Sequence, residues 1–116
     1  MTITFAILAA ATAVGTIGQF LDAYTTNYGV NIAKVATEGN SAATGLVAHP
    51  VLNFLVKAGG PLAAGLLGLF LLPHLAPDVS TSDGMQIFIS LILSAAGVWG
   101  FSTAKTNAKI NGGWHL

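Results

Sequence analysis

The chain contains three long apolar segments separated by short polar stretches. Each segment approaches or exceeds the roughly 20 residues that a helix needs to cross about 30 Å of hydrocarbon. Only helices and closed barrels span a bilayer, and these segments lack the alternation of barrel strands. The pattern therefore predicts an all-α integral membrane protein with three transmembrane helices. The apolar segments are Ile3 to Leu21, Val51 to Leu72 and Met85 to Ala104.

Helix signals in the flanking residues predict where each helix begins and ends. Pro50 suits the first turn of the second helix, and Gly59, Gly60 and Pro61 predict a kink near residues 56–60. Pro73 is expected to end that helix, and Ser80, Thr81 or Ser82 is available to cap the third. The expected helices, within one transmembrane domain over residues 1–116, are 3–35, 50–72 and 84–106.

The composition excludes several classes of protein. Hydrophobic residues make up 53% of the chain and charged residues 7%, whereas a soluble domain carries roughly 25% charged residues. The formal net charge of zero and the scattered lysines argue against nucleic-acid binding, which needs clustered cations. The chain has no cysteine, so disulfides and thiolate chemistry are excluded. The expected partners are the lipid bilayer and other membrane protein subunits, or further copies of this chain.

The positions of the four lysines predict the orientation of the chain. Lys34, Lys57, Lys105 and Lys109 all fall on one side of the three predicted spans, and the other side has no Lys or Arg. By the positive-inside rule, the N-terminus is expected outside and the C-terminus inside, in a prokaryotic cytoplasmic membrane. The first segment lacks the cationic start of a signal peptide, so it is expected to stay as a helix.

Lys57 is the least expected residue of the second segment, because a lysine within a membrane span needs compensation. It can extend toward the interface, or it can pair with Asp22 or Glu38 at the same end of the bundle. Asp22 and Lys57 lie at similar depth on neighbouring antiparallel helices, so their pairing would fix the register of those helices. Such a pair could also belong to a proton or ion path, which is the less favoured alternative.

Thr25 and Thr26 follow Asp22 by three and four residues, so all three lie on one helical face. The polar face is either an interhelical or ligand-binding patch, or a helix end satisfied by water and headgroups. The predicted polar cluster comprises Asp22, Thr25, Thr26, Glu38, Asn40 and Lys57.

Small residues recur every four positions on the second and third helices, and such faces allow close helix packing. These faces are expected to pack against other helices of the same chain or against helices of partner subunits. The two predicted faces are Gly60, Ala64 and Gly68 on the second helix and Ala96, Gly100 and Ala104 on the third.

Chemistry-bearing motifs are absent from the sequence. The three histidines are dispersed and no pair has the spacing of metal ligands on one helix face. The chain also lacks a nucleophile elbow, an HExxH motif and a nucleotide-binding glycine loop. No catalytic residue, metal site or cofactor is expected, and the protein is not expected to be an enzyme.

Three stretches resemble a family of small prokaryotic membrane proteins of unknown function. These stretches are LDAYTTNYG, EGN and NFLVKAGGPLAAGLLGLFLL. The family has Asp-x-x-Thr at the end of its first helix, a Glu-x-Asn-like or Glu-Asn-Pro loop element and a lysine early in its second helix. The resemblance implies a compact polar cluster but no activity. In this chain Ser41 stands where the family has proline after the asparagine. The matching positions are Asp22, Thr25, Glu38, Asn40 and Lys57.

The topology is also similar to that of three-helix phage holins, which oligomerise to permeabilise the cytoplasmic membrane, or to that of a virion membrane protein. This similarity concerns length, three spans and a basic tail, without a diagnostic motif. The favoured expectation is a non-catalytic accessory subunit of a larger membrane assembly. A holin-like or virion protein and a small transporter or proton-path component are the two alternatives.

Overall fold

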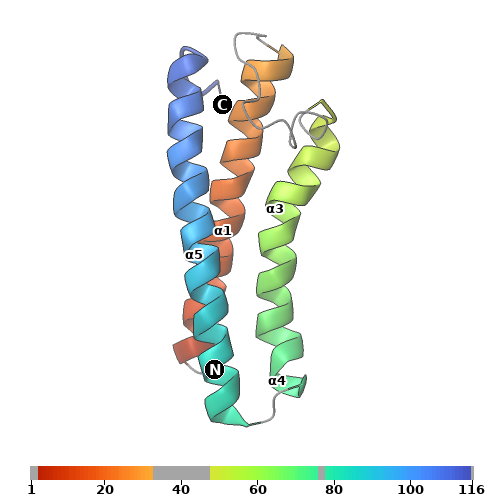
Figure 1. The fold of residues 1–116 in the computed structure, drawn as a ribbon, viewed down its shortest axis with the longest axis vertical. Helices are drawn as coiled ribbons and strands as arrows, with labels where there is room; N and C mark the ends of the chain where they lie inside the picture. The colour runs from red at the N-terminus through yellow and green to blue at the C-terminus, as the bar shows by residue number, and fades with distance from the viewer. Residues whose placement is uncertain (1–2, 33–47, 76–77, 116) are drawn as a thin grey trace.

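The protein consists of three long helical segments, which the computed structural model describes over residues 3–32, 48–75 and 78–115 (Figure 1). Helical segments of 26 to 30 residues within them are long and apolar enough to cross a membrane. Over these described residues, the expectation of an all-helical fold with three such helices is therefore confirmed. The elements are α1 (Ile3–Asn27), η1 (Tyr28–Ile32), α3 (Pro50–Leu66), η2 (Leu67–Leu71), α4 (Leu72–Leu75) and α5 (Val79–Ile110).

Helix α5 is longer at both ends than the sequence predicted. It begins at Val79 rather than residue 84, because the Ser82 N–H already donates to the Asp78 carbonyl. The apolar run marks only the lipid-compatible part of a helix, and the polar residues before it continue the same hydrogen-bond ladder. At the other end, the Gly113 N–H donates to the Ala108 carbonyl at 2.8 Å. Gly112 has a φ of +79°, so the helix ends in a Schellman motif.

Pro73 does not end the second helical segment, which continues through α4 to Leu75. The π-helical segment η2 precedes this proline, and the Leu72 N–H donates to the Leu67 carbonyl five residues back. A wider turn suits a position where the next residue has no N–H to donate. Pro61 lies inside the continuous helix α3, whose yellow-green N-terminal part leans away from α1 in Figure 1.

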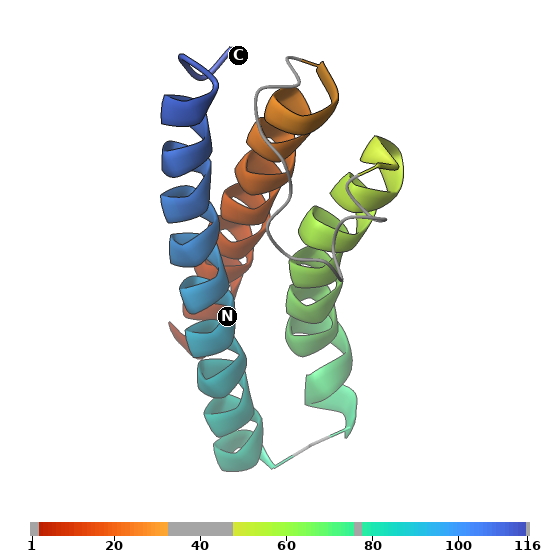
Figure 2. The same ribbon diagram turned by 45° about the horizontal axis from the view of Figure 1, so that its top comes forward.

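Helix α1 lies between the other two and packs on both (Figure 2). Helices α1 and α5 run parallel, and their backbones meet at glycines. A Cβ added at Gly18 would lie 2.8 Å from the Gly97 Cα, and one at Gly100 would lie 2.8 Å from the Gln19 nitrogen. Real Cβ atoms do not approach so closely, so only glycine permits this contact.

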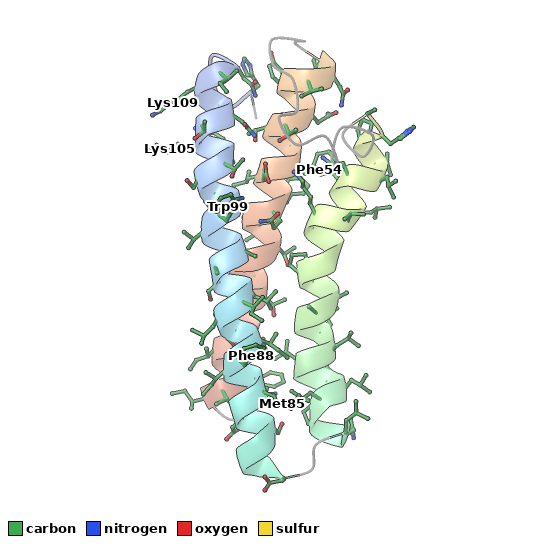
Figure 3. The ribbon with its side chains drawn as sticks, in the orientation of Figure 1. Phe54, Met85, Phe88, Trp99, Lys105 and Lys109 are labelled. Atoms are coloured by element: carbon green, nitrogen blue, oxygen red, sulfur yellow. The ribbon has the colours of Figure 1, made fainter. Side chains whose placement is uncertain are left out.

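Helix α3 runs antiparallel to α1 and packs mainly on it. A Cβ added at Gly65 would lie 2.7 Å from the Thr12 Cβ, so these helices also approach closely. Near the C-terminal end of α1, Phe20 packs against Phe54 with ring centroids 5.2 Å apart, and Figure 3 shows Phe54 between α3 and α1. A small apolar core lies between the helices toward the other end and contains Leu8, Ala11, Leu69 and Leu93.

The predicted small-residue faces are only partly internal. On α5, Gly100 and Ala104 are buried and Ala96 is half-buried. On the second segment, Gly68 is buried against Leu8, but Gly60 and Ala64 are exposed. Positions four apart drift around a helix by about 40° per step, so such a series does not stay on one contact.

The glycine contact between α1 and α5 gives a direct test of the packing. We expect Gly18→Ala to lower the free energy of unfolding by about 1–3 kcal/mol, because the added methyl group must push the two backbones apart. The matched control is Gly84→Ala, where an added Cβ meets nothing within 4 Å and helix propensity favours alanine. Reversible unfolding in mixed micelles measures both, and equal stability of the two variants would contradict the contact.

Candidate functional site

An ion pair joins α1 and α3 near the C-terminal end of α1. The Lys57 Nζ lies 3.2 Å from the Asp22 Oδ2, and the two side chains are 20% and 8% exposed. The structure therefore brings together the two residues that the sequence placed at similar depth. Removing two charges from water is costly, so a buried pair of this kind needs further hydrogen bonds to its remaining polar atoms.

A threonine on α1 supplies one of those hydrogen bonds and extends the contact to α5. The Thr26 hydroxyl donates to the Asp22 Oδ1 at 3.2 Å and accepts a hydrogen bond from the Asn107 amide at 3.0 Å. The Asn107 amide nitrogen also lies 3.1 Å from the Thr25 hydroxyl. We call Asp22, Thr25, Thr26, Lys57 and Asn107 the Asp22 network. This network connects all three long helices at one level.

Thr25 is the most deeply buried member of the Asp22 network. It is 0% exposed, and its hydroxyl donates to the Leu21 carbonyl at 2.9 Å, as helical threonines commonly do. Its own carbonyl accepts a hydrogen bond from the Asn111 amide at 2.9 Å. Asn107 of α5 and Asn111, one turn later and just beyond the end of that helix, therefore hold the end of α1.

Four of the five network residues belong to the polar cluster predicted from the sequence. Asn107 was not predicted, because the third helix was expected to end at residue 106, which left Asn107 and Asn111 in the tail. Their spacing of four residues was a usable signal, since it places both amides on one face of a longer helix. The predicted members Glu38 and Asn40 lie outside the described residues.

Asn53 is a further buried polar residue beside the network. It is 0% exposed, and neither its Oδ1 nor its Nδ2 has a hydrogen-bond partner, although most buried polar groups have one. In the antiparallel pair, Lys57 is level with Asp22, so Asn53, one turn earlier on α3, is level with Thr26. Asn53 could have been identified from the sequence as a single amide side chain within the second apolar segment.

The C-terminal residues fold back onto the end of α1. The Tyr24 hydroxyl donates to the His115 carbonyl, and the His115 ring stacks on Tyr28 with centroids 4.0 Å apart and planes within 10°. The His115 Nε2 lies 2.9 Å from the Asn111 carbonyl. These contacts continue the polar connection between α1 and α5 beyond the Asp22 network.

A second polar layer connects the helices at the opposite end of the bundle. The Thr4 hydroxyl lies 2.8 Å from the Asp83 Oδ1 and 3.0 Å from the Gln86 Oε1. The Gln86 amide donates to the Gly68 carbonyl in the π-helical segment η2 at 3.2 Å. This layer again involves all three helical segments, and the apolar core and the glycine contact separate it from the Asp22 network.

The chemistry available to the Asp22 network is that of a neutralised charge pair with hydrogen-bonded neighbours. Lys57 and Thr26 each contact one oxygen of the carboxylate. Over residues 3–32, 48–75 and 78–115, no three side chains of His, Cys, Asp or Glu converge as metal ligands would. His49 and His74 are exposed near the two ends of the second helical segment, and His115 stacks on Tyr28.

No family model, no curated protein and no solved structure matches this chain. Of the two resemblances suggested by the sequence, the structure supports only the topology, since the described residues form three helices long and apolar enough to cross a membrane.

The ion pair predicts an ordering of variant stabilities. We expect Lys57→Met alone to lower the free energy of unfolding by up to about 3 kcal/mol, because it leaves the Asp22 carboxylate without a cation. The double variant Asp22→Leu, Lys57→Met should be more stable than that single variant, since it removes both charges. A detergent unfolding series measures the order, and a double variant that is the least stable of the set would reject a buried pair.

Asn53 and Asn107 should change stability in opposite directions when each is replaced by leucine. We expect Asn53→Leu to match or exceed the parent in stability, by up to about 2 kcal/mol, because it removes buried polar atoms without partners. Asn107→Leu should lower stability by about 1–3 kcal/mol, since it removes the two hydrogen bonds to Thr25 and Thr26. The same unfolding assay compares them, and a loss at Asn53 equal to that at Asn107 would show that the Asn53 amide is bonded.

Proposed function

We propose that this protein is a non-catalytic structural subunit of a larger membrane assembly. Its α3 helix would pack, through the exposed surface around Gly60, against a membrane-spanning helix of a partner protein. The observation that carries the proposal is a pair of bare glycines, Gly59 and Gly60, in the middle of an apolar helix. A Cβ added at either position meets nothing within 4 Å.

The other glycines within the helical contacts have a role inside the chain. Gly15, Gly18, Gly97 and Gly100 allow α1 and α5 to meet, and Gly65 makes room for Thr12. Gly59 and Gly60 have no such role, although each glycine in a helix interior costs about 1 kcal/mol relative to alanine. Packing of a helix from another protein on this exposed backbone would explain why glycine occurs at these positions despite its cost.

The residues around Gly60 suit helix docking in a bilayer. Val56 and Leu67 are 52% and 55% exposed, and Ala64 between them is also exposed. Small residues flanked by larger apolar ones let two helix backbones approach closely, and this packing drives association where lipid removes the hydrophobic effect. The same surface would serve self-association if the assembly contained copies of this chain.

The two polar layers support a structural rather than a transporting role. Each ties the three helices together, so α3 is presented by a fixed bundle instead of a lone helix. Leu8, Leu69 and Leu93 pack between the layers, and a proton or ion path would need polar groups to continue through that region. A transporter using Asp22 and Lys57 is therefore the less supported alternative.

The distribution of charge supports an orientation in the membrane. Lys57, Lys105 and Lys109 lie at the end of the bundle that carries the C-terminus, and the opposite end carries Asp78 and Asp83. By the positive-inside rule, we place the C-terminus in the cytoplasm and the N-terminus outside, in a prokaryotic cytoplasmic membrane.

A photo-crosslinking experiment tests the docking surface. With a photoreactive side chain at Leu67, we expect one defined adduct with a second membrane protein in native membranes. Gly60→Leu should reduce this adduct at least about ten-fold, because a side chain fills the contact that the glycine leaves open. Gly84→Leu is the matched control, since Gly84 is also a helical glycine without neighbours within 4 Å, but on α5.

The identity of the adduct separates the possible functions. An adduct that Gly60→Leu removes and Gly84→Leu retains supports the subunit assignment. An adduct between two copies of this chain would favour a self-associating, holin-like protein. Labelling that is spread over lipid and unaffected by Gly60→Leu would reject docking at this surface.

A further inference from the structure

The C-terminal end of α5 carries an open, largely apolar hollow bordered by two lysines, which is separate from the Asp22 network and from the bare glycines of α3. The hollow has a volume of about 280 Å³. We propose that it binds the phosphate headgroup of an anionic phospholipid. Its lining residues are Lys105, Ala108, Lys109, Gly112, Gly113 and Trp114.

The two lysines of this hollow have no acidic partner among the described residues. Lys105 and Lys109 are exposed, lie four residues apart on one face of α5, and are labelled near its C-terminal end in Figure 3. Of the described acids, Asp22 is paired with Lys57, and Asp78 and Asp83 lie near the start of α5, about 33 Å or more from Lys105 along the helix. Two uncompensated ammonium groups side by side favour an anionic ligand.

The wall of the hollow is held in place by the tail. Gly113 is fixed by its hydrogen bond to the Ala108 carbonyl, and His115 is fixed by its stacking on Tyr28. Trp114 lies between these two anchored residues. A ligand would therefore meet a formed site and would lose little affinity to the ordering of a free chain end.

The position of the hollow favours a lipid headgroup over a free anion. Helix α5 has 32 residues, so at about 1.5 Å per residue it exceeds the roughly 30 Å of hydrocarbon. Its last turn then lies at headgroup level, where lysines attract anionic lipids and tryptophan rings are enriched. Trp114 is 40% exposed and offers an apolar ring to the glycerol and acyl region, which a free phosphate ion lacks.

Tryptophan fluorescence can test this proposal, because the chain has only two tryptophans. In a Trp99→Phe variant, Trp114 is the sole reporter. The protein is reconstituted in phosphatidylcholine vesicles that contain a brominated lipid, with bromine on the acyl chains near the glycerol. This lipid is phosphatidylglycerol in one sample and phosphatidylcholine in the other, at the same mole fraction. We expect Trp114 to be quenched preferentially by the brominated phosphatidylglycerol, with a preference of about five-fold per lysine.

Charge-removing variants and a second reporter provide the controls. Lys105→Gln and Lys109→Gln should each lower the preference about five-fold, and the exposed positions should leave the helix content by circular dichroism unchanged. In a Trp114→Phe variant, Trp99 lies in the apolar part of α5, so it should be quenched equally by both lipids. Equal quenching of Trp114 by both lipids would overturn the proposal. A preference abolished by millimolar inorganic phosphate would also overturn it, because it would assign the site to a soluble anion.

Discussion

The bundle depends on the need to satisfy one carboxylate within apolar surroundings. The Asp22 side chain is 8% exposed, and burying such a charge is costly unless it is both paired and hydrogen-bonded. Lys57 supplies the charge from α3, and Thr26 supplies a hydrogen bond that Asn107 of α5 supports in turn. One buried group therefore sets the level at which three helices meet.

The arrangement around α1 explains where the remaining surfaces of the protein lie. Helix α1 meets α5 through glycines on one face and α3 through Asp22 and Thr12 on another. Because α3 packs mainly on α1, part of its surface has no neighbour within the chain, and this part includes the bare glycines. The Asn111 amide and the stacking of His115 on Tyr28 continue the α1–α5 contact, so the hollow bordered by Lys105 and Lys109 is held by the same pair of helices.

The sequence predicted the helices and the ion pair because both follow from length and charge. Three apolar runs are sufficient to predict three helices, and a lysine and an aspartate at similar depth made their pairing one of the expected arrangements of Lys57. The sequence did not predict which faces of α1 and α5 meet, because the rotation of a helix depends on packing among many small residues. Gly18 and Gly97 were therefore missed. Asn107 and the other residues of α5 beyond its apolar run were also missed, because hydrophobicity marks a membrane span and not the end of a helix.

The most direct measurement of the central contact is a nitrogen–carbon dipolar coupling between the Lys57 side chain and the Asp22 carboxylate. It is recorded by solid-state NMR on the protein reconstituted in lipid vesicles, with labelled lysine Nζ and aspartate Cγ. We expect a coupling consistent with the 3.2 Å separation of Lys57 Nζ and Asp22 Oδ2, and its loss in Lys57→Met. A spectrum that does not change in that variant would contradict the account.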